Sequence, residues 1–237
     1  MRRVALVAGG TGDIGRAVCR ELHGAGMRVA VGYARSADAA QTLAASCDGI
    51  AVNLSAADDP DEAVRAVHKT LGALDVLVNA AGMNRESGAP AMSREDWQAV
   101  MDLNVTFAFR LTQAVLPIML MQRYGRIVHI SSIAGRVGGR GQINYAASKA
   151  ALERMTRVFA LETGRKGVTA NCVAPGVIVS AMSERVRQDH EKEILSQIAC
   201  RRFGEPEEVA HAVAFLAGER AGYINGAVLP VDGGMLL

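Results

Sequence analysis

The sequence predicts a single doubly wound α/β domain. Short apolar runs alternate with longer amphipathic stretches along all 237 residues, an order that is typical of parallel strands joined by crossover helices. Half of the residues are hydrophobic but only 4% are aromatic, which suits strands and helices that pack closely through Val, Ala, Leu and Ile. No internal repeat or flexible linker divides the chain, so we expect residues 1–237 to form one domain.

The candidate strands are seven apolar runs bounded by glycine or polar residues. They lie at 4–8, 28–33, 49–54, 74–79, 125–131, 168–174 and 227–231. The amphipathic patterns between them predict helices over 13–25, 36–46, 58–71, 93–121, 143–165, 181–198 and 205–217. Such helices cover both faces of a parallel sheet, whose ligands bind beyond the carboxyl ends of the strands.

Composition excludes several classes of protein. The net charge is only +2 and the basic residues are spread along the chain, which argues against a nucleic-acid-binding protein. Four cysteines without a CxxC pair and five histidines without ligand spacing predict neither disulfides nor a metal site. We expect the cysteines to be buried and His129 to be a core group with satisfied hydrogen bonds. With no signal peptide and no run of ~20 apolar residues, we expect a cytoplasmic protein that does not enter a membrane.

The first candidate strand runs into a glycine-rich turn that opens a helix. The turn comprises Gly9, Gly10, Thr11, Gly12, Asp13, Ile14 and Gly15. Phosphate groups require backbone N–H groups that no Cβ atom obstructs, together with a helix N-terminus that points at them. The position of the turn therefore predicts a dinucleotide site; the alternative is a turn that is merely tight.

The end of the second candidate strand bears on the choice of dinucleotide. A carboxylate there would bind the 2′-hydroxyl of NAD and repel a 2′-phosphate. The segment Tyr33-Ala34-Arg35-Ser36 has no acidic residue before Asp38, whereas Arg35 and Ser36 suit a phosphate. The sequence favours NADP(H) over NAD(H), unless Arg35 is an ordinary solvated charge.

Tyr145 and Lys149 are four residues apart in a predicted helix, so they share one face. A phenol with an ordinary pKa of ~10 is a weak acid–base group near neutrality. A neighbouring ammonium stabilises the phenolate, so we expect Lys149 to lower the pKa of Tyr145. This spacing is common by chance, and its meaning depends on the residues that accompany it.

The order of motifs resembles that of the short-chain dehydrogenase/reductase family over essentially the whole chain. After the glycine turn come Asn79-Ala80-Ala81-Gly82, Asn104, Ser131-Ser132, the Tyr145–Lys149 pair and Pro175-Gly176. The resemblance implies one Rossmann-type domain with a seven-stranded parallel sheet.

The resemblance also implies four catalytic roles. Tyr145 donates a proton to the substrate carbonyl as the nicotinamide delivers hydride. Ser132, thirteen residues before Tyr145, orients the carbonyl oxygen; Ser131 is its rival. Lys149 holds the nicotinamide ribose, and Asn104 holds a water that links Lys149 to solvent.

Further positions are implied to contact the cofactor. Asn53 and Leu54 fall where the family contacts the adenine, and Asn79 to Gly82 pass close to the ribose. The stretch that holds the carboxamide begins at Pro175 and Gly176. It continues to Val177 and Ser180.

Three departures from the family pattern stand out. Asp13 replaces a glycine of the turn, where a carboxylate would repel a pyrophosphate unless it caps the helix, as we expect. Gly12 stands where NADP-preferring members often have a basic residue, so the 2′-phosphate would depend on Arg35 and Ser36. Ala80 replaces the second Asn of the common Asn-Asn-Ala-Gly.

Within the family, the chain most resembles β-ketoacyl-acyl-carrier-protein reductases. This resemblance implies a homotetramer that uses NADPH to reduce the β-keto group of a carrier or CoA thioester. Arg123 and Lys166 fall where such reductases present basic residues to the acidic carrier, although ordinary solvated charges would explain them equally. Gln142 is a further candidate for substrate contact, and residues 181–203 are the expected substrate lid.

Other functions stay open at this stage. The segment 83–92 is more polar than in those reductases, and Arg140 lies near the expected mouth of the site; a polyketide ketoreductase would suit both. A small free alcohol or ketone is another possible substrate class. A non-catalytic regulatory protein is a third alternative, which the complete set of four catalytic residues opposes.

Overall fold

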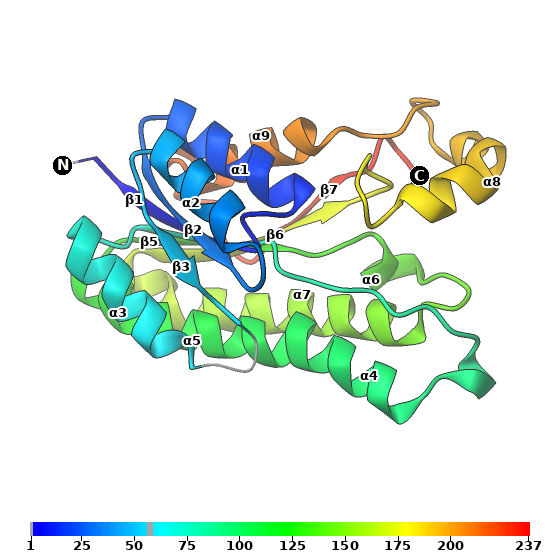
Figure 1. Cartoon of the computed structure of the whole chain (residues 1–237), viewed down its shortest axis with the longest axis horizontal. Helices are drawn as coiled ribbons and strands as arrows, with labels where there is room; N and C mark the ends of the chain where they lie inside the picture. Colours follow the sequence, from blue (N-terminus) through cyan, green and yellow to red (C-terminus); the bar gives the residue numbers. More distant parts are fainter. Residues whose placement is uncertain (1, 56–58) are drawn as a thin grey trace.

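The computed structural model describes residues 2–55 and 59–237. Seven parallel strands form one sheet in the order β3-β2-β1-β4-β5-β6-β7 (Figure 1). The strands are β1 (Val4–Ala8), β2 (Arg28–Tyr33), β3 (Ala51–Asn53), β4 (Val76–Asn79), β5 (Gly125–Ile130), β6 (Val168–Pro175) and β7 (Val228–Val231). The predicted doubly wound sheet is confirmed.

Helices cover both faces of the sheet, as Figure 1 shows. One face carries α1 (Asp13–Gly24), α2 (Ala37–Ser46) and α9 (Pro206–Ala217). The other carries α3 (Pro60–Leu71), α5 (Ala108–Gln122) and α7 (Ile143–Thr163). The first residue of the predicted helix 58–71 lies outside the described residues.

The alternation of side chains along β1 explains why this strand is central. Ala5 and Val7 pack in the core beneath α1, whereas Leu6 and Ala8 pack in the core on the opposite face. All four side chains are fully buried, as expected of a strand covered on both sides. The register pairs Leu6 with Ala30 of β2 and with Leu77 of β4.

The chain changes direction between β1 and β4. It first builds β2 and β3 on one side of β1, then returns to build β4 to β7 on the other. Open sheets of this type bind ligands in the crevice at this switch point, beyond the carboxyl ends of the strands. The glycine turn after β1 and the polar residues after β4 and β5 lie at this edge.

The predicted helix over 93–121 is three segments in the structure. α4 (Arg94–Met101) passes through a π-helical turn, η2 (Asp102–Phe107), into α5. Together Arg94–Gln122 form one helical run of 29 residues that is long and apolar enough to cross a membrane by length and composition alone, contrary to the expectation from the sequence. A core helix meets the same criterion, and α5 packs on β4, β5 and α3.

Shorter helices were not predicted. They are η1 (Ala89–Ala91), α6 (Ala134–Val137), η3 (Gly164–Lys166) and η4 (Glu219–Ala221). The helix α8 (Glu184–Gln197) occupies the expected lid region at the right of Figure 1, beyond the carboxyl end of β6.

All four cysteines are free thiols. Cys19, Cys47 and Cys172 are buried as expected, but Cys200 is exposed in the turn after α8, so the expectation is wrong for this residue. Burial raises the pKa of the Cys19 and Cys172 thiols, the latter to about 12. Among the described residues, no cluster of His, Cys, Asp or Glu could hold a metal ion.

Candidate active site

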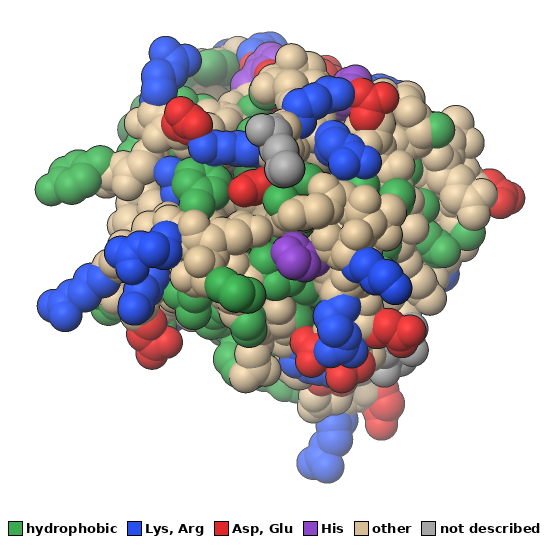
Figure 2. Space-filling model, turned by 90° about the vertical axis from the view of Figure 1, so that its left-hand side faces the viewer, with side chains coloured by type: hydrophobic (Ala, Val, Ile, Leu, Met, Phe, Trp, Pro, Cys, Tyr) green, Lys and Arg blue, Asp and Glu red, His purple; other side chains and the backbone are tan. Residues whose placement is uncertain are grey.

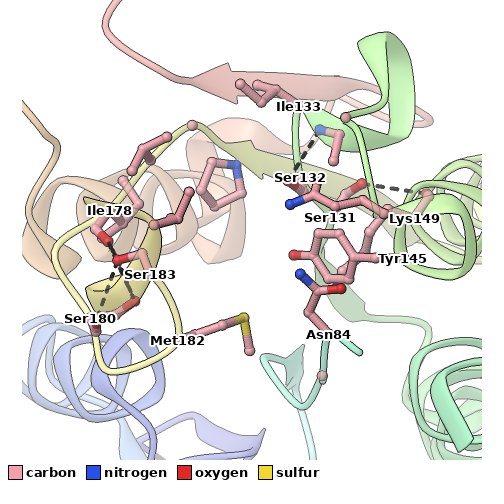
Figure 3. Close-up of a pocket in the computed structure, with 18 of the residues that line it drawn as sticks. Asn84, Ser131, Ser132, Ile133, Tyr145, Lys149, Ile178, Ser180, Met182 and Ser183 are labelled. Carbon is pink, nitrogen blue, oxygen red and sulfur yellow. Dashed lines mark hydrogen bonds between the residues drawn. The ribbon is translucent and has the colours of Figure 1, made fainter. Parts of the chain in front are cut away.

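A cavity of about 590 Å³ opens at the carboxyl ends of β4, β5 and β6. Figure 3 shows Ser132, Lys149, Tyr145 and Asn84 along one wall, with Ile178, Ser180, Met182 and Ser183 facing them. The two walls come from separate segments of the chain, since Lys149 on one wall and Ile178 on the other are 29 residues apart. The structure therefore brings three of the four predicted catalytic residues, Ser132, Tyr145 and Lys149, to one cavity, whereas Asn104 does not line it.

Lys149 lies one helical turn after Tyr145 on α7, and both side chains point to the end of β5. Its ammonium group donates a 2.8 Å hydrogen bond to the carbonyl oxygen of Ile130 and lies 5.5 Å from the centre of the Tyr145 ring. The residue is only 4% exposed. This burial lowers the pKa of Lys149 to about 8, because an ammonium is poorly solvated there.

The environment of Tyr145 differs from the one that the sequence predicts. Burial raises the pKa of its phenol, and a hydrogen bond with the Ser132 side chain acts in the opposite direction. The expected lowering by Lys149 is not found, because removal of the phenolate from water outweighs the other effects. Tyr145 is therefore held as a neutral phenol.

The structure distinguishes the two serines after β5. The hydroxyl of Ser132 accepts a 3.2 Å hydrogen bond from the N–H of Ala134 and interacts with Tyr145. The Ser131 hydroxyl donates to Glu153 Oε1 at 2.9 Å. Ser132 is thus the partner of Tyr145, whereas Ser131 ties β5 to α7.

Glu153 is a residue that sequence reasoning missed. It is 8% exposed, and its carboxylate also lies 3.8 Å from the Arg136 guanidinium. Its position one turn after Lys149, on the same face of α7, was the available signal. Arg136 continues this connection to the carbonyl oxygen of Val228 on β7.

Asn104 lies inside the π-helical turn η2 and is 1% exposed. Its amide exchanges two hydrogen bonds with the backbone of Met83, at 2.9 and 3.0 Å, and donates a third to the Ser148 hydroxyl at 2.9 Å. Ser148 in turn donates to the carbonyl oxygen of Tyr145. Asn104 therefore joins the segment after β4 to the first turn of α7.

The glycine turn has the close packing that a dinucleotide site requires. A Cβ atom on Gly9 would lie 2.7 Å from the N atom of Ala81, and one on Gly15 would lie 2.1 Å from the Gly9 oxygen. Gly12 is the N-cap of α1 and provides no side-chain cap. The first N–H groups of α1 thus remain available, at the positive end of the helix dipole, for a pyrophosphate.

Asp13 does not cap α1, so that expectation is wrong. It is the first residue of the helix, and its carboxylate turns away from the N–H groups. Oδ1 accepts a 2.6 Å hydrogen bond from Arg16, and Oδ2 accepts one of 2.9 Å from the backbone N–H of Ala181. Arg16 offsets the negative charge that would otherwise disfavour a pyrophosphate, and the turn fits the group.

The predicted adenosine contacts surround the end of β2. Gly32 permits close packing, because a Cβ atom there would lie 2.6 Å from Leu54. Leu54 is buried, whereas Asn53, Arg35 and Ser36 are exposed. Ser36 is the N-cap of α2. Within the described part of the chain, no hydrogen bond or ion pair is formed by the Arg35 side chain.

The segments after β4 and β6 border the rest of the expected cofactor path. Asn79 Oδ1 accepts from the N–H of Ala81, while its buried Nδ2 has no hydrogen-bond partner among the described residues. Gly82 leaves space beside Lys149 and Asn104. Across the cavity, the Ser180 hydroxyl lies within hydrogen-bonding distance of the Ile178 carbonyl oxygen and of Ser183. This cleft fits the nicotinamide end of the cofactor.

A second polar group at the cavity was only partly anticipated. Gln142, which the sequence marked, and Asn84 both donate to Oε1 of Glu86, at 3.0 and 2.9 Å. All three residues line the cavity. Asn84 and Glu86 lie in the polar segment 83–92, and that polarity was the available signal.

Arg123 and Lys166 lie far from this cavity. Arg123 precedes β5 and Lys166 precedes β6, at the amino ends of the strands, opposite the cleft. They are neighbours there, because a Cβ atom on Gly167 would lie 2.3 Å from the Arg123 carbonyl oxygen. Figure 2 shows this edge, where Lys and Arg side chains lie among Asp and Glu. The structure does not bring these two residues together with the catalytic set.

His129 is fully buried on β5. Burial, with a smaller effect of the Lys149 charge, lowers its pKa to about 3, so its ring is neutral at ordinary pH. Nε2 lies 3.4 Å from the Thr112 hydroxyl, but Nδ1 has no hydrogen-bond partner in the described part of the chain. His129 is the expected core group, although only one ring nitrogen is satisfied.

Comparison with known proteins gives full-length matches. A family model described as “Enoyl-(Acyl carrier protein) reductase” matches residues 9–236. The chain is 42% identical to the 3-oxoacyl-[acyl-carrier-protein] reductase of Synechocystis, over 99% of this chain and 97% of that protein. It is 40% identical to the acetoacetyl-CoA reductase of Allochromatium vinosum and 38% identical to 3-oxoacyl-[acyl-carrier-protein] reductase FabG of Staphylococcus epidermidis, with 100% of each chain covered.

These matches extend over the glycine turn, the Tyr145–Lys149 helix and the segments that join them. They agree with the seven-stranded parallel sheet and with a cavity at the carboxyl ends of its strands. The chain therefore belongs to the short-chain dehydrogenase/reductase family, and is an NAD(P)H-dependent oxidoreductase.

Proposed function

We propose that the chain reduces the β-keto group of an acyl-carrier-protein or CoA thioester to a secondary alcohol. The observation that carries this proposal is the alignment of Ser132, Tyr145 and Lys149 along one wall of a largely apolar cavity. The names of the relatives, which specify 3-oxoacyl and acetoacetyl thioesters, support the substrate class.

The catalytic roles follow from the positions of these side chains. Ser132 orients the substrate oxygen, since its hydroxyl lies beside that of Tyr145. Tyr145 is held as a neutral phenol, the form that can protonate the oxygen. Lys149 supplies a positive charge behind the phenol and binds the ribose, and Asn104 orders the segments on either side of it.

The bound cofactor supplies the hydride for the carbonyl carbon. NADPH is the proposed form, because Arg35 and Ser36 are exposed beside the end of β2 and no carboxylate lies between Tyr33 and Ser36. The remaining cofactor residues are those that border the cleft from Gly9 to Gly15, from Asn79 to Gly82 and from Pro175 to Ser180.

The proposal extends to the setting of the enzyme. We propose a cytoplasmic homotetramer in which residues 181–203 act as the substrate lid. A carrier protein that docks at Arg123 and Lys166 would serve the cleft of a neighbouring subunit, because these residues lie at the opposite edge of their own sheet.

The test is NADPH oxidation by the purified protein, followed spectroscopically with β-ketoacyl thioesters and with free ketones of matched length. The proposal expects kcat/KM for the thioesters to exceed that for free ketones by at least about tenfold. Preference for free ketones would instead favour a small-molecule oxidoreductase. Absence of NADPH consumption with every ketone would favour a non-catalytic protein.

A further inference from the structure

The segment after β4 and the segment before α7 are joined at the mouth of the cavity. The backbone N–H of Ser87 donates to the Gly141 oxygen at 2.9 Å, and Asn144 Nδ2 donates to the Arg85 oxygen at 2.9 Å. Asn144 is fully buried, and its Oδ1 accepts the N–H of Tyr145 at 2.7 Å. This wall of the substrate site is therefore fixed to the catalytic helix.

Glu86 orients two amide groups in this wall. Its Oε1 atom accepts hydrogen bonds from Asn84 and from Gln142. The amide donors are thus directed to Glu86, which leaves a carbonyl oxygen on each amide to face other groups. Asn84 Oδ1 has no hydrogen-bond partner among the described residues, and Figure 3 shows Asn84 beside Tyr145.

The charges that border the cavity are few and unequally placed. In the described part of the chain, the only lining residues with ionisable acidic or basic side chains of the Asp, Glu, Lys or Arg type are Glu86 and Lys149. Lys149 is buried and donates to the backbone of Ile130, at the inner end of the site. Glu86 is exposed at the mouth, so a substrate enters past a negative charge.

The nearby arginine side chains do not neutralise the Glu86 carboxylate. Arg85 pairs with Asp96 at 3.2 Å. Arg140 is exposed and does not line the cavity. The other lining residues in the described part of the chain are apolar or uncharged, among them Ile133, Val137 and Met182.

We propose that Glu86 is a specificity-determining residue, which makes the site select β-keto thioesters over the β-keto acids of the same chain length. The inference rests on the proposed function and narrows it. A β-keto acid carries a carboxylate two bonds from the ketone, so it would bring a second negative charge beside Asn84 and Glu86. A thioester has no charge at that position, so the Glu86 carboxylate does not repel it.

The test compares kcat/KM for a short β-ketoacyl thioester and for the corresponding β-keto acid. Glu86→Gln removes the charge and keeps an oxygen that can accept from the amides. We expect the thioester-to-acid ratio to fall about tenfold, through a rise in kcat/KM for the acid. Glu162→Gln, an exposed glutamate near the far end of α7, is the matched control and should leave the ratio unchanged.

A ratio that stays within twofold of the wild-type value in Glu86→Gln would overturn the inference. Calorimetric affinities of the two ligands give the same comparison without turnover. A wild-type protein that reduces neither ketone, yet binds the thioester more tightly and loses this preference in Glu86→Gln, would uphold the inference while refuting the proposed function. Reduction of the thioester with an unchanged ratio would do the reverse.

Discussion

The carboxylate of Asp13 accepts a hydrogen bond from the backbone N–H of Ala181, 168 residues later in the chain. This contact joins the start of α1, where a pyrophosphate is expected, to the segment that leads into α8. A glycine, which the family resemblance implies at this position, could not make this contact. The contact links the expected cofactor half of the cleft to the segment that we propose as the lid.

Asp13→Gly should loosen the lid while sparing the cofactor. We expect faster hydrogen exchange and proteolysis over residues 181–198 and a loss of about 1 kcal/mol in the free energy of unfolding. NADPH affinity should change less than about threefold, because Arg16 already offsets the charge of Asp13. Hydrogen exchange in the lid that equals the wild-type rate would refute the link.

Tyr145→Phe should abolish most turnover and leave the cofactor bound. Removal of the general acid is expected to lower kcat by about 10²–10⁴-fold, whereas the ring and the adjacent Lys149 stay in place. NADPH affinity, measured by fluorescence titration, should remain within a few-fold of wild type. If the variant retained more than about a tenth of wild-type kcat, Tyr145 would not be the proton donor.

The pH dependence of reduction should reflect Lys149. Its pKa is lowered to about 8 by burial, and burial raises that of Tyr145, so above pH 8 the lysine loses its charge while the phenol stays protonated. We expect kcat/KM to be level near neutrality and to decline above about pH 8. A profile that stays level to pH 9.5 would contradict the role of the ammonium.

The lowered pKa of Lys149 also affects the free energy of unfolding, which it should raise over the pH range in which activity declines. An unfolded lysine has a pKa of ~10.4, so between about pH 8 and ~10.4 the unfolded state binds more protons than the folded state. The contribution of Lys149 to the free energy of unfolding therefore rises with pH in this window. Urea unfolding of the wild type and of Lys149→Met, measured at pH 7.5 and 9.5, would isolate this contribution.

Arg35→Ala should discriminate between the two nicotinamide cofactors. If Arg35 binds a 2′-phosphate, the KM for NADPH should rise at least about tenfold, while the KM for NADH changes little. Arg20→Ala, an exposed arginine on α1, provides the control for a general loss of positive charge. Equal increases in both KM values would exclude Arg35 as the phosphate ligand.

Asn104→Ala should lower the stability of the protein as well as its catalytic activity. The change removes the three hydrogen bonds of a buried amide and leaves the N–H of Met83 without its acceptor. We expect a loss of about 2–4 kcal/mol in the free energy of unfolding. A variant with wild-type stability in urea would show that the two segments are held together by other contacts.

The strands were predictable because each is a buried apolar run. Those at 4–8 and 28–33 match β1 and β2, and the others differ by one or two residues at an end. The π-helical turn Asp102–Phe107 could not be predicted, because an amphipathic pattern gives the same signal whether or not one turn is widened. Asn104 lies in this turn, and its role was predicted from the family resemblance alone.

The candidate site was predictable in its parts and less so in its contacts. Spacing placed Tyr145 and Lys149 on one face, but the raised pKa of Tyr145 depends on burial by distant segments. Likewise, Asp13 was expected to satisfy the nearest helix end, as its sequence position favours, and instead bonds Ala181. Long-range partners of this kind leave no mark in local sequence.

The exposure of Cys200 has a practical consequence. Since the other three thiols are buried and a thiol reacts through its accessible thiolate, a maleimide dye should attach at one position without any engineered substitution. That position follows α8, and its backbone N–H is bonded to the oxygen of Gly233. A fluorophore there would report on the environment at the end of the segment that we propose as the substrate lid.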